Sequence, residues 1–198
     1  MFVSFEGLDG SGKSTQAALL RARLEADGET VLATREPGGT ELGEQIRDLV
    51  LHGGHVEPWA EALLYAAARA QHVEQVIRPA LDRGESVICD RYVDSSVAYQ
   101  GVARGLGLDR VLEINLAAVG GVMPERTFLL LLDASSVAER VGTEHDRLER
   151  EDEAFHRRVD AGYRELAERF PERILVLDGT DTPEKIAKEV HGALRVSA

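Results

Sequence analysis

With 198 residues, of which 43% are hydrophobic and 29% charged, the chain has the length and composition of one globular domain, and a second full domain is not expected. The 35 acidic and 23 basic residues give a net charge of −12, which argues against broad electrostatic binding to nucleic acid or to an anionic membrane. No apolar stretch approaches the ~20 residues that span a bilayer, the first residues leave no room for a signal peptide, and the single cysteine, Cys89, excludes an internal disulfide. We therefore expect a cytoplasmic protein that holds any phosphate with individual basic residues.

Short apolar runs alternate along the chain with longer segments of helical pattern. The runs predict buried strands at Phe2–Glu6, Thr30–Arg35, Ser86–Asp90, Thr127–Asp133 and Arg173–Asp178. Each intervening segment has ten or more residues, enough for a helical crossover between parallel strands. The pattern therefore predicts a three-layer α/β domain over residues 1–198, with a parallel sheet of about five strands flanked by helices.

Two connections depart from this simple alternation. Residues 40–83 are too many for one crossover, so we expect two helices around a turn at His52–His55. Residues 141–150 are rich in charge and poor in large apolar side chains, which predicts a loop. Ligand-gating lids and ordinary solvated loops both have this composition, and composition does not separate them.

The first strand is followed by a glycine-rich motif and then by a predicted helix from about Lys13 to Ala26. Two glycines, Gly7 and Gly12, are separated by four residues, and Lys13 and Ser14 follow. This is the pattern of a phosphate loop, in which the backbone curls around an anion at the positive end of a helix. We expect Lys13 to reach the β and γ phosphates and Ser14 to join the Mg²⁺ shell. The predicted ATP-binding residues of this loop are Gly7, Leu8, Asp9, Gly10, Ser11, Gly12, Lys13, Ser14 and Thr15.

A carboxylate at the end of a neighbouring strand is expected to hold the metal through water. Asp90, which closes the third predicted strand, is the best candidate. Asp133 and Asp178 also end strands, but each can instead cap the helix that follows. Arg91 comes directly after Asp90, so it would lie beside the metal at the sheet edge where open α/β folds bind ligands.

Several classes of nucleotide-binding protein share a phosphate loop. The only asparagine, Asn115, is followed by Leu116, so the Asn-Lys-x-Asp loop of guanine-nucleotide switches is absent. The sequence resembles bacterial thymidylate kinases over nearly its whole length. The blocks that carry the resemblance are Phe5–Thr15 (FEGLDGSGKST), Thr34–Thr40 (TREPGGT), Leu63–His72 (LLYAAARAQH), Asp90–Gly101 (DRYVDSSVAYQG) and Asp146–Glu149 (DRLE).

The resemblance implies a fold, an activity and an assembly. The fold would be that of P-loop nucleoside monophosphate kinases, and the reaction would be transfer of the γ-phosphate of ATP to dTMP, with Mg²⁺ as cofactor. Relatives are homodimers, which implies a homodimer here. Two alternatives stay open: a kinase for another nucleoside monophosphate or a deoxynucleoside, and a nucleotide-binding regulator without turnover.

The acceptor phosphate is already ionised at pH 7, so the chemistry needs cations rather than a general base. Arginine suits this task because its planar fork pairs with two phosphate oxygens. We expect Arg91 and Arg35 to bind the acceptor phosphate, although a solvated Arg35 is also compatible with the sequence. The resemblance implies that Asp9 helps to place the monophosphate and that Glu36 and Pro37 lie in a turn close to it.

Base selection is expected from Tyr65 and Arg69, which lie four residues apart on one helix face, so a base can stack on the ring while the guanidinium donates to a pyrimidine carbonyl. Relatives often have an acidic residue where this chain has Ala68, which predicts a less firmly oriented arginine. The resemblance implies that three further residues line the nucleotide pocket: Ser96, Tyr99 and Gln100. Ser96 or Gln100 is expected to contact the base, and Tyr99 is expected to exclude a 2′-hydroxyl.

The predicted lid is the main departure from the family pattern. Residues 140–147 are fewer than in the usual lid and lack its run of arginines. Arg147 is the first choice for contact with the transferring phosphate, Arg140 for a place near the adenine, and Arg150 is an alternative for the phosphate.

Overall fold

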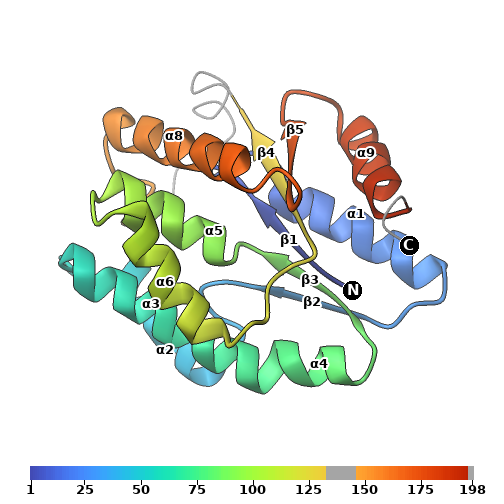
Figure 1. The fold of residues 1–198 in the computed structure, drawn as a ribbon, viewed down its shortest axis with the longest axis horizontal. Coiled ribbons are helices and arrows are strands. Elements are labelled where there is room, and N and C mark those ends of the chain that lie inside the picture. Colours follow the sequence, from blue (N-terminus) through green and yellow to red (C-terminus); the bar gives the residue numbers. More distant parts are fainter. Residues whose placement is uncertain (133–145, 196–198) are drawn as a thin grey trace.

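The protein is described by a computed structural model over residues 1–132 and 146–195 (Figure 1). Its five strands form one parallel sheet in the order β2-β3-β1-β4-β5. They are β1 (Phe2–Glu6), β2 (Val31–Arg35), β3 (Ser86–Asp90), β4 (Arg126–Leu131) and β5 (Ile174–Asp178). The predicted α/β class is confirmed: β1 and β3 have the predicted bounds, and those of β2, β4 and β5 differ from the predicted ones by one or two residues.

Helices connect the strands and cover the sheet. They are α1 (Lys13–Ala26), α2 (Glu41–Leu51), α3 (Pro58–His72), η1 (Val73–Ile77), α4 (Arg78–Asp82), α5 (Val93–Ser96), η2 (Val97–Ala103), α6 (Leu108–Val119), α8 (Glu153–Arg169) and α9 (Pro183–Arg195). Within the described ranges, none of these helices has the length and apolar character of a membrane span.

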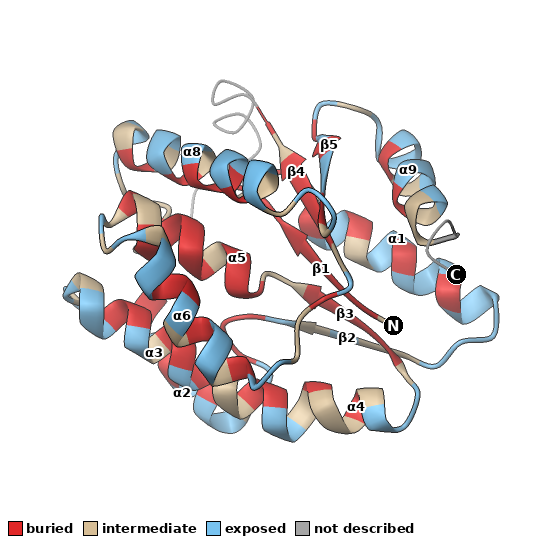
Figure 2. Cartoon of the chain, in the orientation of Figure 1, coloured by how far each residue is buried: buried red, intermediate tan, exposed pale blue. Residues whose placement is uncertain are grey.

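Two apolar cores lie on opposite faces of the sheet because successive side chains of a strand point to opposite sides. Val3 and Phe5 pack with Leu20 of α1 and Ile186 of α9 in the smaller core. Phe2, on the other face, belongs to the larger core, which also includes residues of α2, α3, α5, η2, α6 and α8. Burial is dense along β1 and β3 and continues through α5 and η2, which follow the carboxyl end of β3 (Figure 2).

The long connection after β2 contains α2 and α3, joined by a turn that includes the predicted His52–His55 segment. Thr40 precedes α2, and its hydroxyl accepts a hydrogen bond from the Gly43 amide at 3.0 Å. Two π-helical segments, η1 and η2, were not predicted, because the sequence pattern indicates only that these residues are helical. Asp133 and residues 141–145 of the predicted lid lie outside the described residues.

Candidate active site

The carboxyl ends of β1, β3 and β2 meet at one edge of the sheet. In the strand register Asp90 lies opposite both Phe5 and Arg35. The phosphate loop follows β1, Glu36 follows β2 and Arg91 follows β3. Because all three strands are parallel, residues far apart in the sequence converge where open α/β folds bind ligands.

The loop after β1 folds as a phosphate loop. Gly7 has a φ of 138°, and a Cβ at this position would collide with the carbonyl oxygen of Leu130, so only glycine fits. The Lys13 ammonium is buried and donates to the carbonyl oxygen of Leu8 at 2.8 Å. Burial, together with the nearby Arg91 guanidinium, lowers the pKa of Lys13 to about 8. An anion in this loop would reverse that effect, because it favours the charged ammonium.

The side-chain oxygens of Ser14 and Asp90 lie together beside the loop. The Ser14 hydroxyl donates to Oδ2 of Asp90 at 2.6 Å. Both residues line the same pocket as Lys13. A hydroxyl and a carboxylate are hard oxygen donors of the kind that Mg²⁺ prefers, so the two predicted metal residues fit that ion. Asp178 ends β5 and accepts hydrogen bonds from the amide and the hydroxyl of Thr180, so it closes a turn and does not cap α9, whose Lys185 amide donates to the Thr182 hydroxyl at 3.3 Å.

Arg91 lies where the two halves of the site join. Its φ of 68° is the only left-handed backbone conformation among the non-glycine residues of the described chain, and such outliers gather at functional sites. Its guanidinium pairs with Asp9 at 2.5 Å, donates to the Gly7 carbonyl at 3.0 Å and lies 5.4 Å from the centre of the Tyr99 ring. Burial alone would raise the pKa of Asp9, but Arg91 and Lys13 outweigh it and lower that pKa to about 2.

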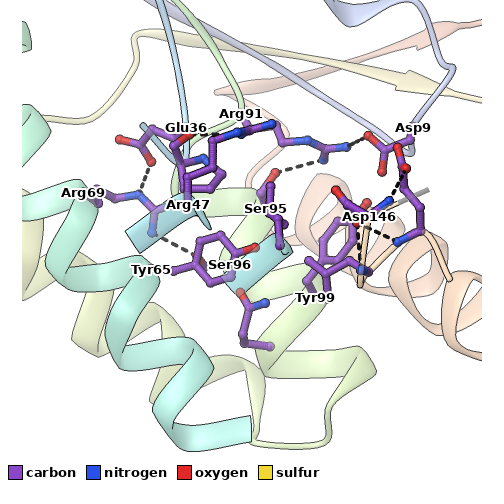
Figure 3. A pocket seen from close by; sticks show the side chains of 15 residues that line it. Asp9, Glu36, Arg47, Tyr65, Arg69, Arg91, Ser95, Ser96, Tyr99 and Asp146 are labelled. Atoms are coloured by element: carbon purple, nitrogen blue, oxygen red, sulfur yellow. Dashed lines mark hydrogen bonds and ion pairs between the residues drawn. The ribbon is translucent and has the colours of Figure 1, made fainter. Parts of the chain in front are cut away.

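Two adjoining pockets share lining residues at this point, and Figure 3 shows the side chains of the one around Tyr65 and Arg69. One contains the phosphate loop and the Ser14–Asp90 pair. The other lies between α3, η2 and the turn at residues 146–149. The residues that line both are Asp9, Glu36, Arg47 and Arg91. A triphosphate in the first pocket and a second nucleotide in the other would therefore meet at Arg91.

Arg69 lies at the inner wall of the second pocket and is almost completely buried. It pairs with Glu36 at 2.6 Å and donates to the Ser96 hydroxyl, to the side-chain oxygen of Asn115 and to the carbonyl of Tyr92. The expectation that Ala68 leaves this arginine loosely oriented is therefore wrong. The carboxylate that fixes Arg69 comes from Glu36, after β2, rather than from the preceding residue in its own helix.

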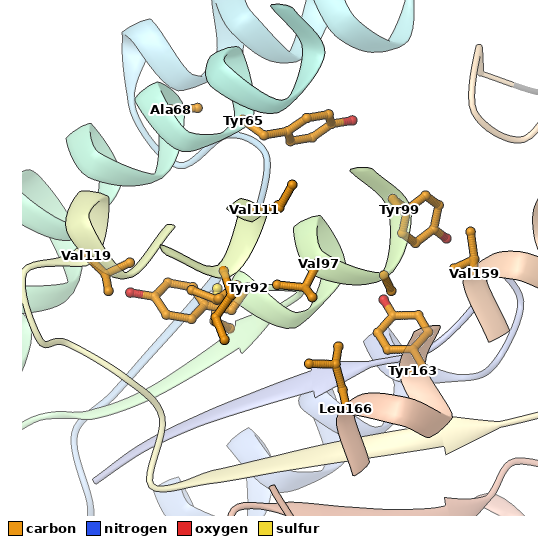
Figure 4. Close-up of a cluster of buried hydrophobic side chains, with 14 of the residues drawn as sticks. Tyr65, Ala68, Tyr92, Val97, Tyr99, Val111, Val119, Val159, Tyr163 and Leu166 are labelled. Atoms are coloured by element: carbon orange, nitrogen blue, oxygen red, sulfur yellow. The ribbon is translucent and has the colours of Figure 1, made fainter. Parts of the chain in front are cut away.

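The predicted base-binding residues surround the same pocket. Tyr65, Ser96, Tyr99 and Gln100 all line it together with Arg69. The rings of Tyr65 and Tyr99 project from α3 and η2 at the pocket end of the larger core (Figure 4). Pro37 is also part of the lining, beside Glu36.

Arg35 and Arg147 are held by protein groups. Arg35 lines the phosphate pocket, pairs with Glu44 at 3.0 Å and donates to the Pro37 carbonyl at 2.8 Å. Arg147 pairs with the buried Glu61 and donates to the Val50 carbonyl at 2.7 Å. It therefore lies beside α2 and α3, next to the second pocket. Arg140 lies outside the described residues, and Arg150 lies in the turn that begins at Asp146.

Sequence reasoning missed several polar residues of the site. Glu6, at the end of β1, accepts hydrogen bonds from the Tyr92 amide and from the hydroxyls of Ser95 and Tyr163. Burial, followed by the charge of Asp94, raises the pKa of Glu6 to about 7. Both hydroxyls also contact the Arg91 guanidinium at 3.3 Å, so Glu6 supports Arg91 indirectly.

Two more residues of the site were missed, and only the first of them has a signal in the sequence. Glu61 precedes Tyr65 and Arg69 by four and eight residues, so it lies on the same helix face, where an acidic side chain calls for a partner. Arg47 lines both pockets and donates to the Pro37 carbonyl at 3.1 Å. It follows Ile46 on the amphipathic helix α2, and that position alone predicts a surface residue.

Comparisons with known proteins agree with this geometry. A family model described as thymidylate kinase matches residues 5–190. A thymidylate kinase of Clavibacter michiganensis subsp. michiganensis is 53% identical over 194 residues, which is 96% of this chain and 92% of the relative. The thymidylate kinase of Deinococcus radiodurans is 48% identical, with 98% of this chain and 96% of the relative covered. A crystal structure of thymidylate kinase from Ehrlichia chaffeensis superposes with a TM-score of 0.83 at 33% identity and covers 98% of both chains. The predicted resemblance is confirmed, and the chain belongs to the thymidylate kinase family.

Proposed function

We propose that the protein transfers the γ-phosphate of ATP to dTMP and releases ADP and dTDP. The observation that carries the proposal is the junction of two pockets at Arg91 and Asp9, one built around a phosphate loop and the other around Tyr65 and Arg69. The family membership supports it. No observation in the described chain favours another nucleoside monophosphate, a deoxynucleoside or a role without turnover over this reaction.

On the donor side, the phosphate loop holds the triphosphate. The residues assigned to it are Gly7, Leu8, Asp9, Gly10, Ser11, Gly12, Lys13, Ser14 and Thr15. The Lys13 ammonium neutralises the β and γ phosphates as charge moves during transfer. Ser14 and Asp90 would hold Mg²⁺, which when bound offsets the charge of the phosphate oxygens.

On the acceptor side, Arg91 positions the monophosphate in line with the donor. Its guanidinium is fixed by Asp9, by the Gly7 carbonyl and by the two hydroxyls that bond to Glu6, those of Ser95 and Tyr163. The guanidinium therefore needs no reorganisation when the phosphate binds. Arg35 and Arg47 lie in the adjoining wall and add positive charge there. Binding energy in the second pocket then keeps the two phosphates in contact while water is excluded.

The base is held by the second pocket. The Tyr65 ring offers a stacking face, and Arg69, fixed by Glu36, offers a donor for a pyrimidine carbonyl. Tyr99 closes the pocket next to Arg91, where it excludes a 2′-hydroxyl, and Ser96 and Gln100 complete the wall.

Other predicted properties belong to the same proposal. The protein acts as a single domain and a homodimer in the cytoplasm, without nucleic acid or membrane partners. Residues 141–150 act as its lid, with Arg140 near the adenine. The contact of Arg147 with the transferring phosphate stays a prediction, and its ion pair with Glu61 supports a place in the dTMP half instead.

A coupled assay of ADP release with ATP and Mg²⁺ tests the reaction. Turnover is expected with dTMP, and kcat/KM should be lower by at least about tenfold for the monophosphates of deoxyuridine, deoxycytidine and guanosine. Asp90→Asn should lower kcat by about a hundredfold, whereas Asp178→Asn, at the end of β5, should leave it unchanged. Absence of dTDP, or equal loss in both variants, would contradict the proposal.

A further inference from the structure

The amide of Gln100 is fixed in one orientation at the wall of the dTMP pocket. Its Nε2 donates to Oε1 of Glu61 at 2.9 Å, and both side chains are buried. Its Oε1 is buried and has no hydrogen-bond partner among the residues that the structure describes. Gln100 also lines the pocket. A buried acceptor without a partner is costly, so this oxygen is a site for a ligand donor.

Glu61 dictates this orientation. Its carboxylate pairs with Arg104 at 3.3 Å and with Arg147, so it carries charge and can only accept hydrogen bonds. If the Gln100 amide turned over, its carbonyl oxygen would face the carboxylate, and two acceptors would be opposed. Only the amide nitrogen can face Glu61, so the oxygen is left without a protein partner at the pocket wall.

The two guanidinium groups also hold Glu61 in place. Arg104 extends from the end of η2 and pairs with Glu151 at 2.6 Å, and its guanidinium packs 4.5 Å from the centre of the Phe155 ring. Arg147 is anchored to the Val50 carbonyl. The carboxylate is thus clamped between η2, α2 and the turn at residues 146–150, and it cannot follow a moving amide.

We propose that Glu61 is a positioning residue that makes the enzyme selective for pyrimidines with a protonated N3, by holding Gln100 as an obligatory acceptor. The inference rests on the proposed function. Thymine attached to a sugar has one polar hydrogen, on N3, and Gln100 Oε1 is the acceptor that pairs with it. Cytosine has an unprotonated N3 whose lone pair would oppose Oε1, so the same fixed amide rejects it.

The test uses dTMP and 5-methyl-2′-deoxycytidine monophosphate, which differ only at N3 and the C4 substituent. Dissociation constants for both and for ATP are measured by calorimetry for the wild type, Glu61→Gln and Glu151→Gln. Glu61→Gln can face Gln100 with either its oxygen or its nitrogen, so it no longer fixes the amide. We expect it to weaken dTMP binding about tenfold and to reduce the preference over the cytosine analogue about tenfold, with ATP affinity unchanged.

Glu151→Gln is the matched control, because it removes a carboxylate from the same Arg104 without touching Gln100. It should keep the wild-type preference. A preference retained in Glu61→Gln, or equal weakening of dTMP and ATP, would overturn the proposal. If Glu61→Gln does not fold, Glu61→Asp provides the same test, since it keeps the charge but withdraws the carboxylate from Gln100 by one methylene.

A double-mutant cycle separates positioning from general damage. Once Gln100→Leu has removed the amide, Glu61→Gln should cost little further dTMP affinity, and additive losses would contradict the coupling. All these readouts are binding constants. A wild-type protein that binds dTMP but does not phosphorylate it would therefore refute the proposed function and leave the positioning role to be judged on its own data.

Discussion

Arg69 donates from all three of its guanidinium nitrogens to buried partners, whereas Arg35 pairs with Glu44 at the protein surface. Their side chains are 2% and 47% exposed. Removing Arg69 would leave the carboxylate of Glu36 buried without its main partner, which is far more costly than breaking an exposed pair.

We therefore expect Arg69→Met to reduce the free energy of unfolding by about 3–5 kcal/mol and Arg35→Met by less than about 1 kcal/mol. Urea denaturation at pH 7.5 without ligands measures both. Similar losses in the two variants would mean that the network around Arg69 does not stabilise the fold as its burial indicates.

Lys13 gives the site a pH dependence of predictable sign. Its pKa is lowered to about 8 by burial and by Arg91, and bound phosphate groups would raise it again. As pH rises above 8 the free protein loses the ammonium that ATP requires, so ATP affinity should fall about tenfold between pH 7 and pH 9. ATP binding near pH 8.5 should take up a proton.

Calorimetry in two buffers of different ionisation enthalpy measures this uptake. Lys13→Arg is the control, since its guanidinium does not titrate in this range and its binding should take up no proton through that residue. Constant ATP affinity from pH 7 to 9 would show that Lys13 keeps its charge in the free protein.

Site residues whose roles follow from their neighbours in the sequence could be predicted. Site residues whose roles depend on partners far away in the sequence could not. The glycines, Lys13 and Ser14 follow from the stereochemistry of one loop, and Asp90 from its place at a strand end. The sequence around Glu6 indicates only an apolar strand, because its hydrogen-bond partner Tyr163 is 157 residues away and no local pattern connects the two. Likewise, nothing near Arg69 in the sequence identifies Glu36 as the carboxylate that fixes it.

At the scale of elements, η2 and α8 pack closely enough to make one glycine necessary. A Cβ on Gly162 of α8 would lie 3.0 Å from both Ala98 Cα and Val102 Cβ of η2. In contrast, a Cβ on Gly192 of α9 meets nothing within 4 Å. Since η2 carries Tyr99 and Gln100, separation of these two helices would disturb the nucleotide pocket as well as the core.

Gly162→Ala should therefore destabilise the protein by about 1–3 kcal/mol and raise KM for dTMP. Gly192→Ala should be neutral or stabilising by up to about 1 kcal/mol, because alanine is the better helix former. Thermal unfolding and steady-state kinetics measure both effects. A neutral Gly162→Ala would mean that η2 and α8 adjust to the methyl group without cost.

Arg147 attaches the turn at residues 146–150 to the proposed dTMP pocket. Its guanidinium bonds to Glu61 and to the Val50 carbonyl, and its amide donates to the Leu51 carbonyl at 3.0 Å. From this placement we expect Arg147→Ala to raise KM for dTMP about tenfold while kcat changes less than about threefold. A tenfold fall in kcat at saturating dTMP would instead support the predicted contact with the transferring phosphate. Arg150→Ala provides the comparison.

Most elements could be predicted because their apolar periodicity and end signals are local. The helix from Lys13 to Ala26 has the predicted bounds, and α2 begins directly after Thr40, whose side chain caps it. The π-helical hydrogen bonding of η1 and η2 could not be predicted, since it depends on a shift of one residue in the backbone ladder that leaves the apolar pattern helical.

At the scale of the whole molecule, the order of the strands explains how a chain with a net charge of −12 can bind two polyanions. The order β2-β3-β1-β4-β5 brings the ends of three strands together, and Lys13, Arg35 and Arg91 gather there. Alternating strands and helices predict a parallel sheet, and the family resemblance implies its wider fold. The separation of the two nucleotide pockets depends on how α3, η2 and the turn at 146–149 pack, which no local pattern determines.

The helices around the proposed dTMP pocket also present apolar side chains to solvent. Leu49 of α2, Trp59 and Leu63 of α3 and Leu116 of α6 are exposed, and α3 packs against both α2 and α6. Because exposed apolar side chains are buried at subunit interfaces, we expect the interface of the proposed homodimer to include these residues. We expect Leu63→Glu to convert a dimer to a monomer in sedimentation velocity. Leu19→Glu, on the exposed side of α1, should stay dimeric. A dimeric Leu63→Glu, or a monomeric Leu19→Glu, would place the interface elsewhere.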